Sequence, residues 1–146
     1  MAPATDDAQP VRVLPVRDAY ANGTAIERRL YDALDALRVR YEPQWELSLY
    51  RVDAYLPGYR LAVEANGCVW HACATCGFDT PAFDAAAVKA RQARRDERLW
   101  RWFGVRTLHI FGHELTSGAD AIIAVRAALV RAGVRVRARP ERSSEQ

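Results

Sequence analysis

The sequence predicts an α/β fold in which a mixed central sheet is flanked by helices. Two observations predict it. Segments with the apolar period of helices alternate with short apolar segments typical of strands, in the order helix, three strands, irregular loop, helix, strand, helix. In addition, a chain of 146 residues is long enough for a single core. We therefore expect one domain over residues 23–133, between a flexible N-terminal arm, residues 1–22, and a basic tail, residues 134–146.

The first helix is predicted from a capping box at its start and an apolar stripe along one face. Thr24 and Glu27 have the spacing of a capping box, in which two side chains bond free backbone N–H groups of the first turn. We expect this helix to end near Arg40. Its buried stripe is expected to comprise Ile26, Leu30, Ala33, Leu34 and Leu37.

Three short segments after this helix have the length and composition of strands. They are Trp45–Tyr50, Arg51–Leu56 and Tyr59–Ala65. Pro57 and Gly58 form a turn between the last two. We therefore expect those two strands to be antiparallel neighbours.

The second half of the chain begins with a loop. Asn66–Thr80 has no period and contains all three cysteines. A long helix over Pro81–Phe103 follows, because proline is favoured in the first turn of a helix, and Gly104 ends it. A strand over Val105–Phe111 and a last helix over Thr116–Ala132 complete the predicted fold.

The composition indicates a soluble protein. Half of the residues are hydrophobic and 27% are charged, which is ordinary for a globular domain. No apolar run approaches the roughly 18 residues of a membrane helix. Asp6 and Asp7 stand where a signal peptide needs positive charge. We therefore expect a cytoplasmic protein with no membrane association.

Two acidic residues lie in neighbouring predicted strands that are otherwise apolar. Asp53 and Glu64 can approach each other if these strands are antiparallel. Two close carboxylates repel unless a positive charge lies between them, and Mg²⁺ is a common solution. Such an ion can polarise a phosphate and activate a bound water. The alternative is two unconnected, solvent-facing acids.

The long predicted helix is rich in arginine, which is typical of a surface that binds nucleic acid. The side chains that we expect to contact DNA phosphates are Lys89, Arg91, Arg94, Arg95 and Arg98. The alternative is a solvated helix face. Trp100, Trp102 and Phe103 are expected in the core, and Asp96 is expected to pair with an arginine one turn away.

The sequence resembles the very-short-patch-repair endonucleases over residues 22–115. The matching blocks are Thr24–Leu30, Asp53 with Leu56–Arg60, Gly67–His71, the arginine-rich helix with Asp96, and Gly104–Leu108. The resemblance implies a restriction-endonuclease-like core of the PD-(D/E)xK type. It also implies a Mg²⁺-dependent enzyme that nicks duplex DNA beside a T:G mismatch.

The resemblance also implies roles for three residues. Asp53 matches the metal-binding aspartate of these enzymes and His71 their active-site histidine. Glu27 matches an active-site glutamate near the N-terminus, although it could serve only the capping box. His71 could protonate a leaving oxygen or orient water, since histidine titrates near neutral pH.

The chain departs from the family at several positions. Glu64-Ala65-Asn66 looks like the E-x-K half of the general nuclease motif, with asparagine in place of lysine. Asn66 can orient water or contact phosphate, but it supplies no positive charge. Val69 replaces an aromatic residue that helps to open the DNA at the mismatch, while Trp70, a candidate for DNA contact, is retained.

The three cysteines predict a structural zinc site. Cys68, Cys73 and Cys76 supply three thiolates in nine residues, and structural zinc takes four Cys or His ligands. We expect His113 as the fourth ligand, because the resembling family has a zinc-binding cysteine in that region. His71 is the alternative ligand, and His109 is expected to be a packed or surface residue. The alternatives are that the cysteines are buried thiols or a redox pair.

These observations leave two main classes of function. In the first, the protein is a monomeric metal-dependent endonuclease of double-stranded DNA, which serves mismatch repair, restriction, defence or recombination with partner proteins of those processes. In the second, it is a DNA-binding module of the same fold with weak or no catalysis. A third class, a redox or zinc-only interaction protein, leaves the pairing of Asp53 with Glu64 unexplained.

Overall fold

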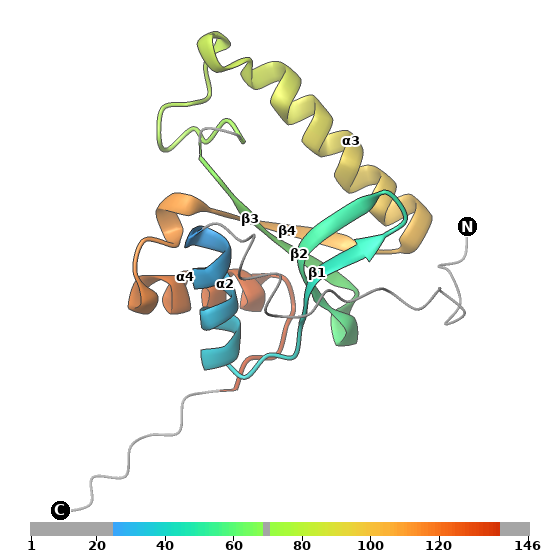
Figure 1. Cartoon of the computed structure of the whole chain (residues 1–146), viewed down its shortest axis with the longest axis vertical. Coiled ribbons are helices and arrows are strands. Elements are labelled where there is room, and N and C mark those ends of the chain that lie inside the picture. Colours follow the sequence, from blue (N-terminus) through green and yellow to red (C-terminus); the bar gives the residue numbers. More distant parts are fainter. Residues whose placement is uncertain (1–24, 69–70, 138–146) are drawn as a thin grey trace, which may run out of the picture.

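The computed structural model describes residues 25–68 and 71–137 (Figure 1). The expected N-terminal arm, Thr24, Val69 and Trp70 lie outside the described residues, as do residues 138–146 of the expected tail. The described part is built as three layers, with helices on both faces of one sheet (Figure 1). The predicted α/β class is confirmed.

The sheet has four strands in the order β1-β2-β3-β4. These are β1 (Glu42–Leu47), β2 (Tyr50–Leu56), β3 (Leu61–Asn66) and β4 (Arg106–Phe111). Strand β2 is antiparallel to β1 and also to β3, and the Pro57-Gly58 turn predicts the second of these pairs. Strand β4 runs parallel to β3. The sheet is therefore mixed, and β3 has a partner on each side.

The three helices divide between the two faces of the sheet (Figure 1). Helices α2 (Ala25–Ala36) and α4 (Gly118–Arg131) contact each other and cover one face. Helix α3 (Ala85–Phe103) lies on the other face, where it contacts β4. A parallel connection needs a crossover element, and α3 is the crossover between β3 and β4.

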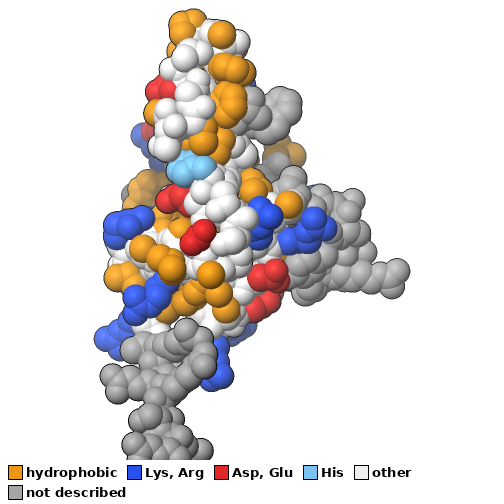
Figure 2. Space-filling view, turned by 90° about the vertical axis from the view of Figure 1, so that its left-hand side faces the viewer, with side chains coloured by type: hydrophobic (Ala, Val, Ile, Leu, Met, Phe, Trp, Pro, Cys, Tyr) orange, Lys and Arg blue, Asp and Glu red, His pale blue; other side chains and the backbone are white. Residues whose placement is uncertain are grey.

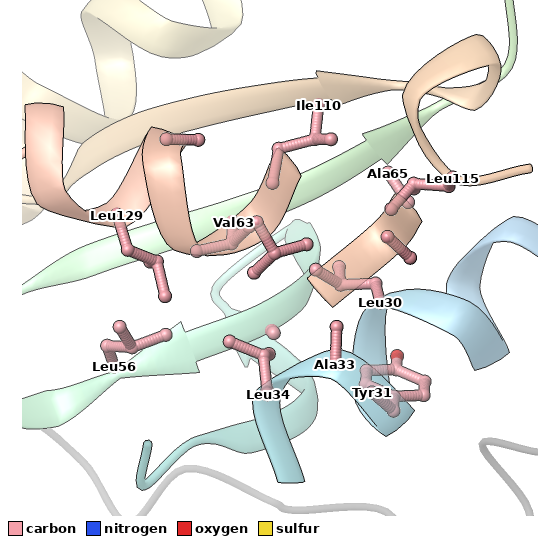
Figure 3. Close-up of a cluster of buried hydrophobic side chains, with 14 of the residues drawn as sticks. Leu30, Tyr31, Ala33, Leu34, Leu56, Val63, Ala65, Ile110, Leu115 and Leu129 are labelled. Atoms are coloured by element: carbon pink, nitrogen blue, oxygen red, sulfur yellow. The ribbon is translucent and has the colours of Figure 1, made fainter. Parts of the chain in front are cut away.

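The main hydrophobic core lies between the sheet and the pair α2 and α4 (Figure 3). Leu30 and Leu34 from α2 meet Val63, Ile110 and Leu129, and none of these side chains is more than 1% exposed. The predicted stripe of the first helix is confirmed at Leu30, Ala33 and Leu34. Val134 packs against the same core at 4% exposure, so the packed part of the chain extends past residue 133.

A second, smaller core lies between the sheet and α3. Trp45 and Tyr55 stack with their ring centroids 3.5 Å apart, and Leu99 and Val105 complete this cluster from the α3 side. The α3 face of the sheet is thus apolar only at one end. At the other end, nearer the cysteine loop, the strands carry polar side chains.

The first two strands differ from the prediction. Strand β1 begins at Glu42 and ends at Leu47, whereas Trp45–Tyr50 was expected. Leu47 pairs with Tyr50, so Ser48 and Leu49 form a two-residue turn. Ser48 adopts a φ of 56°, a conformation that favours glycine, and the sequence offers no glycine as a turn signal there.

Helix α2 ends at Ala36, before the expected Arg40. The N–H of Val39 donates to the carbonyl of Leu34, and the N–H of Arg38 donates to that of Asp35. This is a Schellman motif, in which Arg38 takes the left-handed conformation that glycine usually takes, with a φ of 56°. Without glycine the sequence carries no stop signal.

The other helices start later than predicted. Pro81–Phe83 forms a separate 3₁₀ turn, and Asp84, with a φ of 52°, precedes the start of α3 at Ala85. Helix α4 is capped by Ser117, whose hydroxyl accepts a bond from the N–H of Asp120. Gly104 ends α3 as predicted. Within the described ranges no helix is long and apolar enough to cross a lipid bilayer.

Candidate functional site

The register of β2 and β3 brings Asp53 and Glu64 together. The strands pair through Leu56 with Leu61, Tyr55 with Ala62 and Ala54 with Val63, and the next step puts Asp53 opposite Glu64. Backbone pairing stops there. Instead the N–H of Ala65 donates to the Asp53 Oδ2 atom at 2.8 Å, so a carboxylate takes the place of a ladder carbonyl.

Both carboxylates face α3. Residues two apart in a strand point to the same face, and Ala62, two residues before Glu64, belongs to the core on the α3 side. Tyr55, two residues after Asp53, belongs to the same core. Glu64 is 8% exposed although it is acidic, so its charge needs a partner inside the protein.

Burial raises the pKa of Asp53 to about 7, and the neighbouring charge of Glu64 adds to that shift. Burial also raises the pKa of Glu64, and Arg95 partly offsets this effect. The Arg95 Nη1 atom lies 2.6 Å from the Glu64 Oε1 atom, and its Nη2 atom donates to the Arg51 carbonyl at 2.6 Å. One guanidinium therefore faces two carboxylates.

The donor set fits a divalent cation. The Oε1 atom of Glu64 is fully enclosed, and among the described residues it has the Arg95 ion pair but no well-aligned hydrogen bond. Two facing, partly unneutralised carboxylates are the ligands that Mg²⁺ prefers in proteins. Asp53 and Glu64 could hold such an ion.

A second polar chain was not foreseen from the sequence. The His109 Nε2 atom lies 2.6 Å from the Asp96 Oδ2 atom, and its Nδ1 atom lies 2.9 Å from the Asn66 amide nitrogen. With Asn66 donating to Nδ1, neutral His109 carries its proton on Nε2 and donates it to Asp96. Because Glu64 is in register with His109, the chain lies beside the carboxylates.

This chain bears on three expectations, one of which it corrects. Asp96 pairs with His109, where an arginine partner was expected. His109 was expected to be a packed or surface residue, and the structure adds hydrogen bonds to Asp96 and Asn66. Asn66 is 1% exposed and bonded to His109, and this bond occupies its amide nitrogen. The contact between Asn66 and His109 could have been predicted only from the parallel register of β3 and β4.

His71 lies near the same polar groups, and Gln92 of helix α3 holds its ring. Its Nδ1 atom is 2.9 Å from the Gln92 Oε1 atom. An amide oxygen only accepts, so His71 donates from Nδ1 and neutral His71 has a lone pair on Nε2. The Nε2 atom of His71 is therefore a potential base or, when protonated, an acid.

These groups surround a cavity of about 200 Å³. Its polar lining comprises Glu64, Asn66, His71, Arg91, Gln92, Arg95 and His109. On the face shown in Figure 2, a histidine and acidic side chains lie together with basic side chains around them. A carboxylate, two imidazoles and two guanidinium groups around one small space could bind a phosphate group.

Glu27 is connected to Asp53 through Gln44 and Tyr31. The Gln44 Nε2 atom is 3.5 Å from the Glu27 Oε2 atom and donates to the Tyr31 hydroxyl at 2.9 Å. That hydroxyl donates to the Asp53 carbonyl at 2.7 Å. Burial raises the pKa of Tyr31 above its ordinary value, so the hydroxyl stays protonated. Helix α2 thus fixes the backbone of Asp53 from the opposite face of the sheet.

The predicted cysteine cluster forms around His113. The ligand atoms of Cys68, Cys73, Cys76 and His113 all lie within 4.8 Å of one another. The His113 Nδ1 atom is 3.5 Å from the Cys68 sulfur and 3.4 Å from the Cys73 sulfur. These four residues could hold a metal ion. His71, the alternative ligand, is bonded to Gln92 and lies outside the cluster.

The basic residues of α3 differ in their surroundings. Lys89 pairs with Asp79 at 2.5 Å, and Arg95 pairs with Glu64. Arg91 lines the small cavity, and Arg94 is exposed. The Arg98 Nη1 atom donates to the Tyr50 hydroxyl at 3.4 Å. The expected contacts with DNA stay predictions, and Trp70 lies outside the described residues.

The expectation that Trp100 and Trp102 lie in the core is wrong. Each is 57% exposed. Phe103 packs, partly buried, against the smaller core as expected. Helical spacing explains the error, because Leu99 and Phe103 share the buried side of the last turns of α3, and the tryptophans fall outside it.

Comparison with known proteins adds one structural similarity. No family model matches the chain, and no curated protein matches it. Among solved structures, it is similar to the catalytic domain of the homing endonuclease I-Bth0305I. The identity is 23%, the TM-score is 0.44, and the match covers 75% of this chain and 98% of that one.

Asp53→Asn should stabilise the Mg²⁺-free protein at pH 8 more than at pH 5. Because the folded pKa of Asp53 is about 7 and its ordinary value is 3.8, folding requires uptake of a proton between these values. The contribution of Asp53 to stability therefore falls as pH rises from 4 to 7. We expect a gain in melting temperature on the order of 5 °C at pH 8, measured by differential scanning fluorimetry. The exposed Asp32→Asn is the control, and an equal effect of both variants would contradict the account.

The purified protein should carry about one zinc ion per chain. His113→Ala should lose most of the zinc and lower the melting temperature by about 5 °C or more, since the cysteine loop depends on the ion. His71→Ala, which removes the alternative ligand, should keep it. Elemental analysis of the three proteins decides the matter. Absence of zinc from the wild type, or its loss only from His71→Ala, would show that the ligand set is wrong.

Proposed function

We propose that the protein is a metal-dependent endonuclease that hydrolyses phosphodiester bonds in duplex DNA. One observation carries the proposal: Asp53 and Glu64 face each other where β2 and β3 separate, beside a cavity that also presents His71 and Arg95. Two carboxylates held this way repel each other and disfavour the empty site, so their arrangement is best explained by a cation.

Asp53 and Glu64 would hold Mg²⁺, and the ion would polarise the scissile phosphate and lower the pKa of a bound water. The backbone N–H of Ala65 orients Asp53 by its bond to Oδ2. The Tyr31 hydroxyl holds the Asp53 backbone. Both contacts place the carboxylate before substrate binds, which lowers the cost of organising the site.

Arg95 is the cation that Asn66 does not provide. In the general nuclease motif a lysine follows the glutamate by two residues, and here that position is Asn66, whose amide is bonded to His109. Arg95 reaches Glu64 from α3 and lines the cavity. Its guanidinium can bind two phosphate oxygens at once and stabilise the charge that develops during hydrolysis.

His71 is the proposed acid–base group. Gln92 fixes the ring through Nδ1, so Nε2 can take a proton from water or, when protonated, give one to the leaving oxygen. His109 is a positioning residue, since its two nitrogens are engaged by Asp96 and Asn66. Asp96 and His109 together hold Asn66 in the cavity wall.

The substrate would be double-stranded DNA, bound through its phosphates. The proposed contacts are Lys89, Arg91, Arg94, Arg98 and Trp70, with Glu27 supporting the metal-binding strand through Gln44 and Tyr31. A monomer with one such site cuts one strand at a time. The resemblance to patch-repair enzymes suggests a nick beside a T:G mismatch.

A DNA-binding module without catalysis is the second candidate. It is favoured by the ion pair between Arg95 and Glu64, which neutralises one of the two proposed metal ligands. Against it, a phosphate-binding surface gains nothing from two carboxylates turned toward the same cavity.

Asp53→Asn should abolish cleavage of duplex DNA. End-labelled duplexes, one with a T:G mismatch and one fully paired, are incubated with Mg²⁺ and the products resolved on denaturing gels. We expect one cut strand, and a loss of about 100-fold or more in the variant but not in Asp32→Asn. Cutting of the mismatched duplex alone supports the repair activity, and equal cutting supports a nuclease without mismatch specificity. No cutting in Mg²⁺ or Mn²⁺ by the zinc-loaded wild type favours the binding module.

Arg95→Gln should lower kcat/KM for the same duplex by about 100-fold, and Arg95→Lys should lower it less because lysine keeps the charge. Single-turnover rates measured at saturating protein separate cleavage from binding. The control is Arg126→Gln, which removes an exposed arginine from α4, on the other face of the sheet. If Arg95→Gln cuts as fast as the wild type, Arg95 serves only to neutralise Glu64 and the proposed role is wrong.

A further inference from the structure

A second hollow lies at the end of the sheet away from the cysteine cluster. It has a volume of about 950 Å³ and lies where the β2–β3 turn meets the end of α3. Its lining comprises Gly58, Tyr59, Arg60, Trp100, Arg101, Trp102, Gly104 and Arg106. None of these residues lines the cavity beside Glu64. The proposed active site therefore leaves this hollow unexplained.

The lining combines flat apolar surface with positive charge. Trp100 and Trp102 are each 57% exposed, and burying that surface against a ligand is favourable. Every charged residue of the lining is an arginine, which is the pattern expected for an anionic partner. A second copy of the chain would bring arginine against arginine. A flat lipid surface would not fill a hollow.

The orientation of Trp102 is fixed by its neighbours. The Arg98 guanidinium lies 5.8 Å from the centre of the Trp102 ring, and the Tyr50 ring lies 6.4 Å from it at an angle of 50°. Arg98 is in turn bonded to the Tyr50 hydroxyl. An indole held in this way can accept a stacked ring at little cost in side-chain entropy.

We infer that this hollow binds an unpaired DNA strand, with bases stacked on Trp100 and Trp102 and phosphates near the arginines. Base faces are available for stacking in a single strand, whereas in a duplex they are covered by neighbouring pairs. Leu61, beside the hollow, is three residues before Glu64 in β3, which is about 10 Å along a strand. A strand that leaves the cleavage site can therefore reach it.

The inference rests on the proposed function only in naming the strand as DNA. The stacking surface and its charges are independent of the metal site. Asp53→Asn should consequently bind the single strand as the wild type does, whether or not the wild type cleaves DNA. The two proposals can thus fail separately.

The test is fluorescence anisotropy of a labelled 12-residue oligothymidylate, with a blunt duplex of the same length as comparison, in buffer without Mg²⁺. Trp100→Ala and Trp102→Ala should each weaken binding of the single strand by about five-fold or more, and change duplex binding much less. Ile123→Ala, which removes an apolar side chain 68% exposed on α4, should change neither. Melting temperatures near that of the wild type establish that the variants are folded.

Several results would overturn the inference. Unchanged affinity of both tryptophan variants for the single strand would do so, and so would equal losses for the duplex or in Ile123→Ala. A change of oligomeric state on gel filtration, without a change in strand binding, would assign the surface to protein association. Loss of binding to anionic lipid vesicles alone would assign it to a membrane.

Discussion

The repulsion between two enclosed carboxylates is the constraint on which the rest of the site depends. The pairing of β2 with β3 holds the backbones of Asp53 and Glu64 next to each other. Burial raises the pKa of both groups, and Arg95 supplies a single positive charge beside them. Because the pKa of Asp53 is raised to about 7, folding without a second cation favours a proton on this pair as pH falls below neutral. That cost is the stability penalty expected of the proposed metal-dependent site.

The architecture separates stability from chemistry. The face of the sheet under α2 and α4 carries the main apolar core, in which Leu34 of α2 packs with Val63 and Ile110. The face under α3 carries the polar groups at the end nearer the cysteine loop. Because a buried polar group needs a partner, the protein holds Asn66 by a bond to His109 and Glu64 by an ion pair with Arg95. The rigid apolar face holds the strands in register, and the α3 face can then position reactive groups.

The sequence predicted the features that depend on local pattern. The α/β class and the antiparallel pair that joins Asp53 to Glu64 appear in the structure. His113, which the family resemblance implied as a ligand, also lies beside the cysteines. It missed features that depend on tertiary contact: the bonds of His109 to Asp96 and Asn66 come from the parallel register of β3 and β4 and from α3 packing over them. Errors in element ends arose where Arg38 and Ser48 take conformations usually signalled by glycine. Trp100 and Trp102 were misplaced because an aromatic residue in a helix gives no sign of which face is covered.

The central claim is that Asp53 and Glu64 form a divalent-cation site, and calorimetric titration of Mg²⁺ into the protein at pH 7 tests it most directly. The account predicts one site per chain that disappears in Asp53→Asn and persists in Asp32→Asn. Because the pKa of Asp53 is about 7, binding should also release a proton, so the measured heat should depend on the ionisation enthalpy of the buffer. Equal Mg²⁺ binding by the wild type and Asp53→Asn, or no binding by either, would contradict it.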